Sequence, residues 1–269
     1  MILNVRHAQI HLVDKGSGMP ILFLHGNPDS SEVWDGIIPH LCEHYRCVAP
    51  DLPGFARSSA PSDFDFSLDG LAGFVDDLVR SAHITEPLHL VVHDIGGPYG
   101  LSWAVKHPEK VRSMVIMNTV FSSSYRWHLL GRIWRTPILG ELFQLLTNRP
   151  AFIRELRRAS RKLTLAQMNR TYDRMTPEMK RMVLRLYRAI DPMDFAGRED
   201  QLRALAASIP SLVLWGDHDP YVHKRFAASF GAQRVEHFAD CGHWVPLEAT
   251  QEAAARMLSF YGRQALTGA

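Results

Sequence analysis

The sequence has few of the features that mark secreted or membrane-spanning proteins. Only three of its 269 residues are cysteines, Cys42, Cys47 and Cys241, and they do not have the spacing of a metal site. We expect them to be free thiols in a reducing compartment. No apolar run reaches the length of a membrane-spanning helix, and residues 1–7 hold no apolar core of signal-peptide length. The resulting expectation is a cytoplasmic protein.

The sequence also lacks an excess of charge of one sign. It has 30 Lys and Arg against 28 Asp and Glu, a formal net charge of +2. This balance gives no reason to expect a nucleic acid or a membrane as a partner. The length allows one large α/β domain, or a core domain with a smaller unit inserted into it. The oligomeric state stays open between a monomer and a homodimer.

Short apolar runs alternate with helical patterns over residues 1–118. The run Ile21–Leu24 is apolar throughout, as a strand buried on both faces should be. A hairpin is predicted over residues 1–20, with a strand at 9–13 and a turn at 15–18. Further strands are predicted at 46–50, 90–92 and 111–118, and helices at 31–44, 68–83 and 98–107. Because strands and helices alternate, the sequence predicts βαβ units and a mostly parallel sheet.

The pattern changes at residue 119. Residues 119–209 contain no clear buried strand, and their Leu, Met and Arg residues recur at helical spacing. The α/β pattern resumes at 211–215 and 234–238 and ends in a helix over 253–261. We therefore predict a core domain made of residues 1–118 and 210–269, interrupted by an α-helical insertion at 119–209.

Polar residues follow three of the predicted strands. The stretch from Leu90 to Gly97 is an apolar strand, then His93 and Asp94, then a Gly-rich helix start. This pattern is typical of a nucleophile elbow, a sharp strand-to-helix turn whose usual polar residue is Ser. Asp219 and His243 follow two later strands, and the carboxyl ends of parallel strands share one edge of the sheet. The alternative function for Asp94, as a plain helix cap, does not account for the other two.

Five motifs together resemble those of one known group. The chain is similar to α/β hydrolases with an aspartate nucleophile, the epoxide hydrolases and haloalkane dehalogenases, and the helical insertion would be the cap of that group. The motifs that carry this resemblance are His25-Gly26-Asn27-Pro28, Asp51-Leu52-Pro53-Gly54-Phe55, Val92-His93-Asp94-Ile95-Gly96-Gly97, Trp215-Gly216-Asp217-His218-Asp219-Pro220 and Gly242-His243-Trp244.

The resemblance and the chemistry of these side chains agree. A carboxylate attacks a saturated carbon and forms a covalent ester, which water must then hydrolyse. We assign Asp94 as the nucleophile, His243 as the base that activates water and Asp219 as the acid that orients His243, with Asp217 as its competitor. Some similar dehalogenases place this acid after an earlier strand, near Asn118 in this chain, but an amide cannot serve.

The identity of the leaving group depends on the residues beside the nucleophile. The backbone N–H groups of Asn27 and Ile95 would form the oxyanion hole. The Asn27 amide resembles the halide donor of the dehalogenases, but those enzymes also place a Trp directly after the nucleophile. Ile95 has no side-chain donor, so Trp127 or Trp34 would have to replace it.

Epoxide opening requires an acid at the departing oxygen, and the related epoxide hydrolases use cap tyrosines. Tyr187 lies in a sequence context that resembles one of these, Tyr125 is a plausible partner, and Tyr172 is a weaker one. The alternative is that these rings only pack the cap against the core.

These observations favour an epoxide hydrolase, with a haloalkane dehalogenase as the alternative. A third reading is a non-catalytic member of the fold that binds a small ligand. The expected partners are a small apolar substrate and water, with no cofactor. His40 and His44, with Cys42 between them, show no further ligand motif, so no metal is expected.

Overall fold

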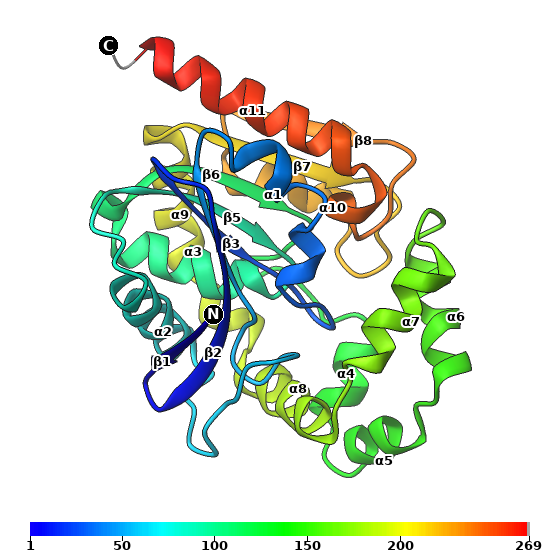
Figure 1. Cartoon of the computed structure of the whole chain (residues 1–269). Coiled ribbons are helices and arrows are strands. Elements are labelled where there is room, and N and C mark those ends of the chain that lie inside the picture. The colour runs from blue at the N-terminus through cyan, green and yellow to red at the C-terminus, as the bar shows by residue number, and fades with distance from the viewer. Residues whose placement is uncertain (268–269) are drawn as a thin grey trace.

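The centre of the protein is an eight-stranded sheet, seen in a computed structural model that describes the backbone of residues 1–267 and the side chains of residues 1–262. The strand order is β1-β2-β4-β3-β5-β6-β7-β8, antiparallel from β1 to β4 and parallel from β4 to β8 (Figure 1). The strands are β1 Ile2–Val5, β2 Ala8–Lys15, β3 Pro20–Leu24, β4 Arg46–Pro50, β5 Leu88–His93, β6 Val111–Met117, β7 Ser211–Gly216 and β8 Arg234–Phe238. The mostly parallel sheet predicted from the sequence is confirmed.

Both faces of the sheet are covered by helices. Successive side chains of a strand point to opposite faces, and in β3 Leu22 and Leu24 join one apolar core while Ile21 and Phe23 join another. The first core is closed by α2 Leu68–Ser81, α3 Gly96–Lys106 and α9 Arg198–Ser208. The second is closed by α1 Ile38–Leu41, α10 Val245–Glu248 and α11 Thr250–Thr267. This two-sided burial explains why β3 is apolar throughout.

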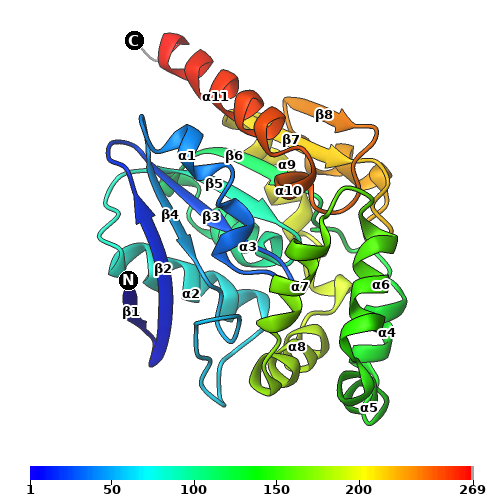
Figure 2. The same ribbon diagram turned by 45° about the vertical axis from the view of Figure 1, so that its right-hand side comes forward.

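A group of helices stands over one edge of the sheet and contains no strand (Figure 2). We call residues 119–197 the cap. The helix α9, which falls within the predicted insertion, packs against α3 beside the sheet and is left out of this definition. The cap helices are α4 Leu129–Arg135, α5 Leu139–Leu146, α6 Arg149–Ala159, α7 Leu165–Asp173 and α8 Pro177–Ala189, followed by a 3-10 turn, η3 Pro192–Phe195.

Two local predictions differ from the structure. The single helix predicted over 31–44 is wrong: it is divided into a 3-10 turn, η1 Ser31–Trp34, and α1. Gly36 lies between them, so close to α11 that an added Cβ would lie 2.4 Å from Thr250 Cγ2. The N-terminal hairpin exists, but it turns at Arg6 and His7, both with positive φ, and the predicted turn at 15–18 instead connects β2 to β3.

Further 3-10 turns are η2 Pro108–Lys110 and η4 Lys224–Phe230. Among the described residues, no helix is long and apolar enough to span a bilayer.

Candidate active site

Asp94 stands at a tight turn between β5 and α3. Its φ is +48°, a left-handed backbone conformation that is uncommon outside glycine. The turn is packed closely enough that a Cβ on Gly96 would lie 2.2 Å from the Leu24 carbonyl oxygen, and one on Gly26 would lie 2.4 Å from Asp94 Cβ. Glycine at these two positions therefore lets the turn form and lifts the Asp94 carboxylate above the sheet.

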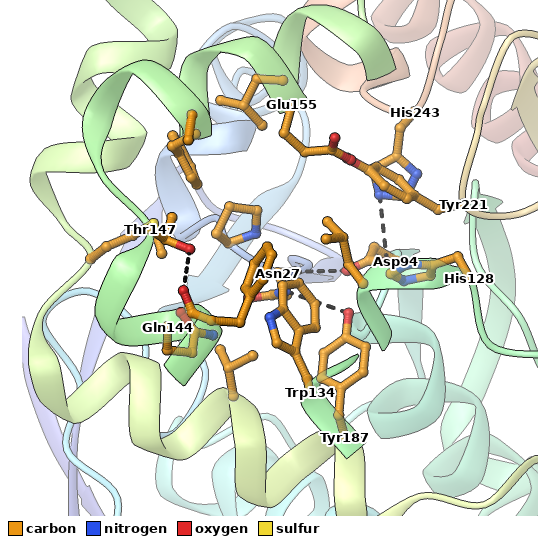
Figure 3. A pocket seen from close by; sticks show the side chains of 18 of the residues that line it. Asn27, Asp94, His128, Trp134, Gln144, Thr147, Glu155, Tyr187, Tyr221 and His243 are labelled. Carbon is orange, nitrogen blue, oxygen red and sulfur yellow. Dashed lines mark hydrogen bonds and ion pairs between the residues drawn. The ribbon is translucent and has the colours of Figure 1, made fainter. Parts of the chain in front are cut away.

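His243 and Asp219 reach Asp94 from two later loops. His243 Nε2 lies 3.5 Å from Asp94 Oδ2 (Figure 3). On the other side of the ring, His243 Nδ1 lies 2.8 Å from Asp219 Oδ2. His243 is 1% exposed, so this contact is shielded from water. The three side chains that the sequence placed after separate strands are thus brought into one hydrogen-bonded chain.

The charges of this chain support one another. Burial alone favours the neutral acid at Asp94, but the hydrogen bond from His243 and its charge lower the pKa of Asp94 to about 2. Burial likewise opposes a charge on His243, and the two carboxylates outweigh it and raise the pKa of His243 well above its ordinary value. These contacts favour the ionised form of Asp94 and the protonated form of His243.

Asp219 is held by the backbone of its own loop and by one side chain. Its Oδ1 accepts from the N–H groups of Tyr221 at 2.7 Å and Val222 at 3.1 Å, and its Oδ2 accepts from Asn118 Nδ2 at 2.9 Å. Asn118, which the sequence had excluded as the acid, thus orients the acid. Its amide is also fixed by Gly216, whose N–H donates to Asn118 Oδ1 at 2.9 Å.

Asp217, the competing candidate for the acid, does not reach His243. Its Oδ1 instead lies 2.6 Å from His237 Nδ1 on β8. The geometry thus selects Asp219 as the carboxylate that contacts His243.

The predicted oxyanion donors differ in what they contact. The Asn27 N–H donates to Asp94 Oδ1 at 2.7 Å. The structure records no hydrogen bond from the Ile95 N–H to the Asp94 carboxylate among the described residues, and the Ile95 side chain lines a small neighbouring cavity. Because Oδ1 is held by Asn27, Oδ2 is the oxygen left facing the main cavity and His243.

Asp94 opens into a cavity of about 290 Å³ between the core and the cap. Most of its wall is apolar, supplied by Leu130, Trp134, Phe143, Ala151, Phe152, Leu156, Met175 and Val183. Polar groups from the cap are His128, Gln144, Thr147, Glu155 and Tyr187. An apolar cavity with a few polar groups is typical of a small-molecule site.

Tyr187 lies across the cavity from Asp94, beside Asn27 (Figure 3). Asn27 Nδ2 donates to Tyr187 Oη at 3.4 Å, so the hydroxyl is the acceptor in that contact and can itself donate to another group. Burial raises the pKa of Tyr187 well above its ordinary value. Trp127 and Trp134 flank the ring, with centroids 4.9 and 4.7 Å away, and fix its position.

His128, which the sequence analysis missed, is a second cap donor. Its Nδ1 accepts the Gly131 N–H at 3.2 Å at the start of α4, so the proton of the neutral ring is on Nε2. Burial lowers the pKa of His128 to about 4, which keeps the ring neutral near pH 7. Its ring centroid lies 6.2 Å from that of Tyr187. No sequence motif marks this histidine, because its only local pattern is that of a helix cap.

The other cap tyrosines are engaged elsewhere. The Tyr125 hydroxyl donates to the backbone carbonyl of Tyr221 at 3.2 Å, and Tyr125 lines the small neighbouring cavity. Tyr172 packs against Phe152 and under the guanidinium of Arg149. Of the tyrosines proposed from the sequence, Tyr187 is the one that lines the main cavity.

The two tryptophans proposed as halide donors do not line the main cavity either. Trp34 packs against Phe23 in the core at a centroid distance of 5.3 Å, and Trp127 lines the small cavity. Trp134, which the sequence analysis did not single out, lines the main cavity, and its buried Nε1 has no hydrogen-bond partner among the described residues.

Glu155 of α6 is a further polar group of the wall. It accepts from Tyr221 Oη at 2.9 Å and from Arg158 Nε at 3.0 Å. The Tyr221 ring in turn meets His243 edge-on, at a centroid distance of 5.1 Å. The Glu155–Tyr221 contact therefore connects the cap to the loop that carries Asp219.

Within the described part of the chain, no group of three or more His, Cys, Asp or Glu side chains could hold a metal ion.

The fold and the order of the polar residues at the strand ends are those of the α/β hydrolases, and comparison with known proteins gives the same family. The chain belongs to the α/β hydrolase fold family, whose model matches residues 19–250. It is 29% identical to haloalkane dehalogenase 2 of Mycobacterium tuberculosis, over 94% of this chain and 92% of that protein. It is 27% identical to a cis-3-alkyl-4-alkyloxetan-2-one decarboxylase of Shewanella oneidensis, over 94% and 85%.

Among solved structures, the chain is similar to the epoxide hydrolase CorEH without ligand. The TM-score is 0.78, with 22% identity and 98% of each chain covered. At this identity the likeness shows the fold alone.

Proposed function

We propose that this protein is an epoxide hydrolase that acts through a covalent ester on Asp94. The observation that carries the proposal is that Tyr187 and His128, two side chains that can donate a proton or a hydrogen bond, both line the cavity that Asp94 faces and each accept the hydrogen bond recorded for them. An opening epoxide needs a proton donor at its oxygen, whereas a departing halide needs only hydrogen bonds.

In the first step Asp94 Oδ2 attacks one ring carbon of the epoxide. A C–O bond forms, the C–O bond of the ring breaks, and the ring oxygen takes the proton of Tyr187 while His128 Nε2 donates a hydrogen bond to it. Tyr187 has a high pKa, so its anion is short-lived and recovers a proton from the solvent. The product of this step is a hydroxyalkyl ester of Asp94.

In the second step His243 removes a proton from water, and the water oxygen attacks Cγ of the Asp94 ester. The Asp94 carboxylate favours the protonated form of His243 before the reaction, but esterification removes that charge. His243 then releases its proton to the solvent more readily and is the neutral base for this step. The Asn27 N–H, already bonded to Oδ1, stabilises the oxyanion. The acyl C–O bond then breaks, and the departing alkoxide takes the proton that His243 removed from water. The diol leaves, and the new carboxyl group releases its proton to the solvent, so that Asp94 is ionised again.

A haloalkane dehalogenase is the second candidate, and one observation favours it. Asn27 and Trp134 both line this cavity, and Trp134 Nε1 has no hydrogen-bond partner among the described residues. Their side-chain N–H groups are the kind of donors that a departing halide requires. The first step would be the same attack by Asp94 with a halide as the leaving group. The relative from Mycobacterium tuberculosis carries that activity in its name.

The test compares the products formed from two substrates of matched chain length. The protein is incubated with 1,2-epoxyhexane and with 1-bromohexane, and diol and bromide are quantified. Diol formation without bromide release supports the proposal, and bromide release without diol overturns it. A 3,4-dialkyl oxetan-2-one, the compound class named for the Shewanella relative, forms a third arm, which is measured by carbon dioxide release.

A further inference from the structure

The outer face of α5 is unusually apolar for a solvent-exposed helix. Of the ten large apolar side chains that are exposed in the described part of the chain, five lie within residues 138–146. We call these five the leucine face: Ile138, Leu139, Leu142, Leu145 and Leu146. Their spacing of three and four residues places them on one side of the helix. Leu145 is 78% exposed and Leu146 is 72% exposed, so packing within the cap does not explain them.

The opposite side of the same helix lines the active-site cavity. Phe143, Gln144 and Thr147 face the cavity, so α5 is a single helix between the leucine face and the substrate. Figures 1 and 2 both place α5 at the outer end of the cap, away from the sheet. A partner bound to the leucine face would therefore be separated from the cavity only by α5.

The charge of the cap indicates what would cover this face. Residues 119–197 contain 15 Lys and Arg against 6 Asp and Glu, a net charge of +9, so the rest of the chain carries −7. The single acid on α5, Glu141, is paired with Arg188 at 2.7 Å. Lys180 Nζ donates to the carbonyl of Gln144 at the end of the helix, at 2.9 Å. The net charge of the whole chain is near zero because a strongly basic cap and an acidic core domain offset each other. The expectation that a membrane is no partner was drawn from that near-zero net charge.

We infer that the leucine face docks on an anionic lipid surface. Exposed leucines beside Lys and Arg are the features of a segment that lies in a membrane interface, where apolar side chains enter the headgroup region and basic ones pair with anionic lipids. A second copy that used the same face would bring two caps of +9 together, which disfavours a cap-to-cap dimer. A nucleic acid would not need the exposed leucines.

The test measures vesicle binding, not turnover, so its result does not depend on the proposed epoxide chemistry. The full chain is sedimented with vesicles of phosphatidylcholine alone and of phosphatidylcholine mixed with phosphatidylglycerol. We expect at least about tenfold stronger binding to the anionic vesicles, reduced by salt of about 0.5 M. The double variant Leu145→Glu/Leu146→Glu should lose about tenfold or more of this binding.

The matched control is Leu165→Glu/Met193→Glu, which changes two exposed apolar side chains of the cap outside the leucine face. It should bind vesicles as the unmodified protein does, and circular dichroism confirms that both variants are folded. Absent vesicle binding, or equal binding by the two double variants, would overturn the inference. So would a dimer seen by light scattering that Leu145→Glu/Leu146→Glu converts to a monomer, because the second copy would then be the occupant.

Discussion

The two walls of the cavity hold their polar groups in different ways. On the core wall, Asp94, Asp219 and His243 are bonded to one another and Asp219 is further held by backbone N–H groups. On the cap wall, Tyr187 and His128 each accept one hydrogen bond and can each donate another. Under the proposed function, the core wall supplies the attacking group and the cap wall supplies the donors to the leaving group.

The comparison predicts that changes on the core wall have the largest effects. Asp94→Asn removes the attacking oxygen and should lower turnover by on the order of 10⁴-fold or more. The substitution keeps the shape of the side chain and its contact with the Asn27 N–H. Diol formation is the measurement, with circular dichroism as the control for folding. Turnover within tenfold of the unmodified protein would show that the core wall does not define the chemistry.

His243→Gln separates the two steps of the reaction. The first step needs Asp94 and the cap donors, and the second needs the base, so the ester should persist while turnover falls by about 10³- to 10⁴-fold. Intact-protein mass spectrometry should show one added substrate mass, and peptide mapping should place it on Asp94. The double variant Asp94→Asn/His243→Gln is the control and should carry no adduct. No adduct on His243→Gln with any substrate would favour the ligand-binding alternative.

The difference between the walls also explains what could be predicted from the sequence. Asp94, Asp219 and His243 each follow a strand, and a parallel sheet brings the ends of its strands to one edge, so topology alone predicts that they meet. Asn118 follows β6 in the same way, but its role depends on an amide that points at Asp219, which strand patterns do not describe.

No comparable rule predicts which side chains of the cap helices meet at the cavity. Tyr125 and Tyr187 were both reasonable ring-opening acids, and what separates them is that the Tyr125 hydroxyl meets the Tyr221 carbonyl, a contact between residues far apart in the chain. His128 lies at the start of a helix, where its position in the sequence indicates a helix cap and gives no sign of a catalytic role. The placement of these side chains depends on helix packing in the cap, which helical periodicity does not fix.

Tyr187→Phe tests the cap wall with its geometry retained. Loss of the hydroxyl should slow ester formation from the epoxide by about 10²-fold or more, because the ring oxygen loses its acid. The flanking rings of Trp127 and Trp134 should still hold the phenyl group in place. Single-turnover formation of the ester, followed by mass spectrometry, is the measurement.

The matched control for this substitution is Tyr125→Phe, which removes a hydroxyl bonded to a backbone carbonyl and should change the rate by less than about threefold. If the two variants lost activity equally, the distinction between the tyrosines would be wrong. If Tyr187→Phe slowed release of bromide as much as opening of the epoxide, the hydroxyl would act as a plain hydrogen-bond donor rather than as an acid.

Asp29 extends the comparison to a carboxyl that lies outside the cavity wall and whose ionisation burial opposes. It is 8% exposed, and Trp244 Nε1 donates to its Oδ2 at 2.8 Å. Burial raises the pKa of Asp29 to about 7. An unfolded chain releases this proton near pH 4, so between about pH 4 and pH 7 the native state binds more protons, and its stability falls as the pH rises through that window.

Asp29→Asn should therefore stabilise the protein by about 1–3 kcal/mol above pH 7, with little gain near pH 4. The asparagine is neutral at every pH, and its Oδ1 still accepts from Trp244. Urea denaturation at both pH values is the measurement, and Asp63→Asn, at an exposed side chain, is the control that should show no such gain above pH 7. An equal gain at the two pH values would mean that the buried proton is not the cause.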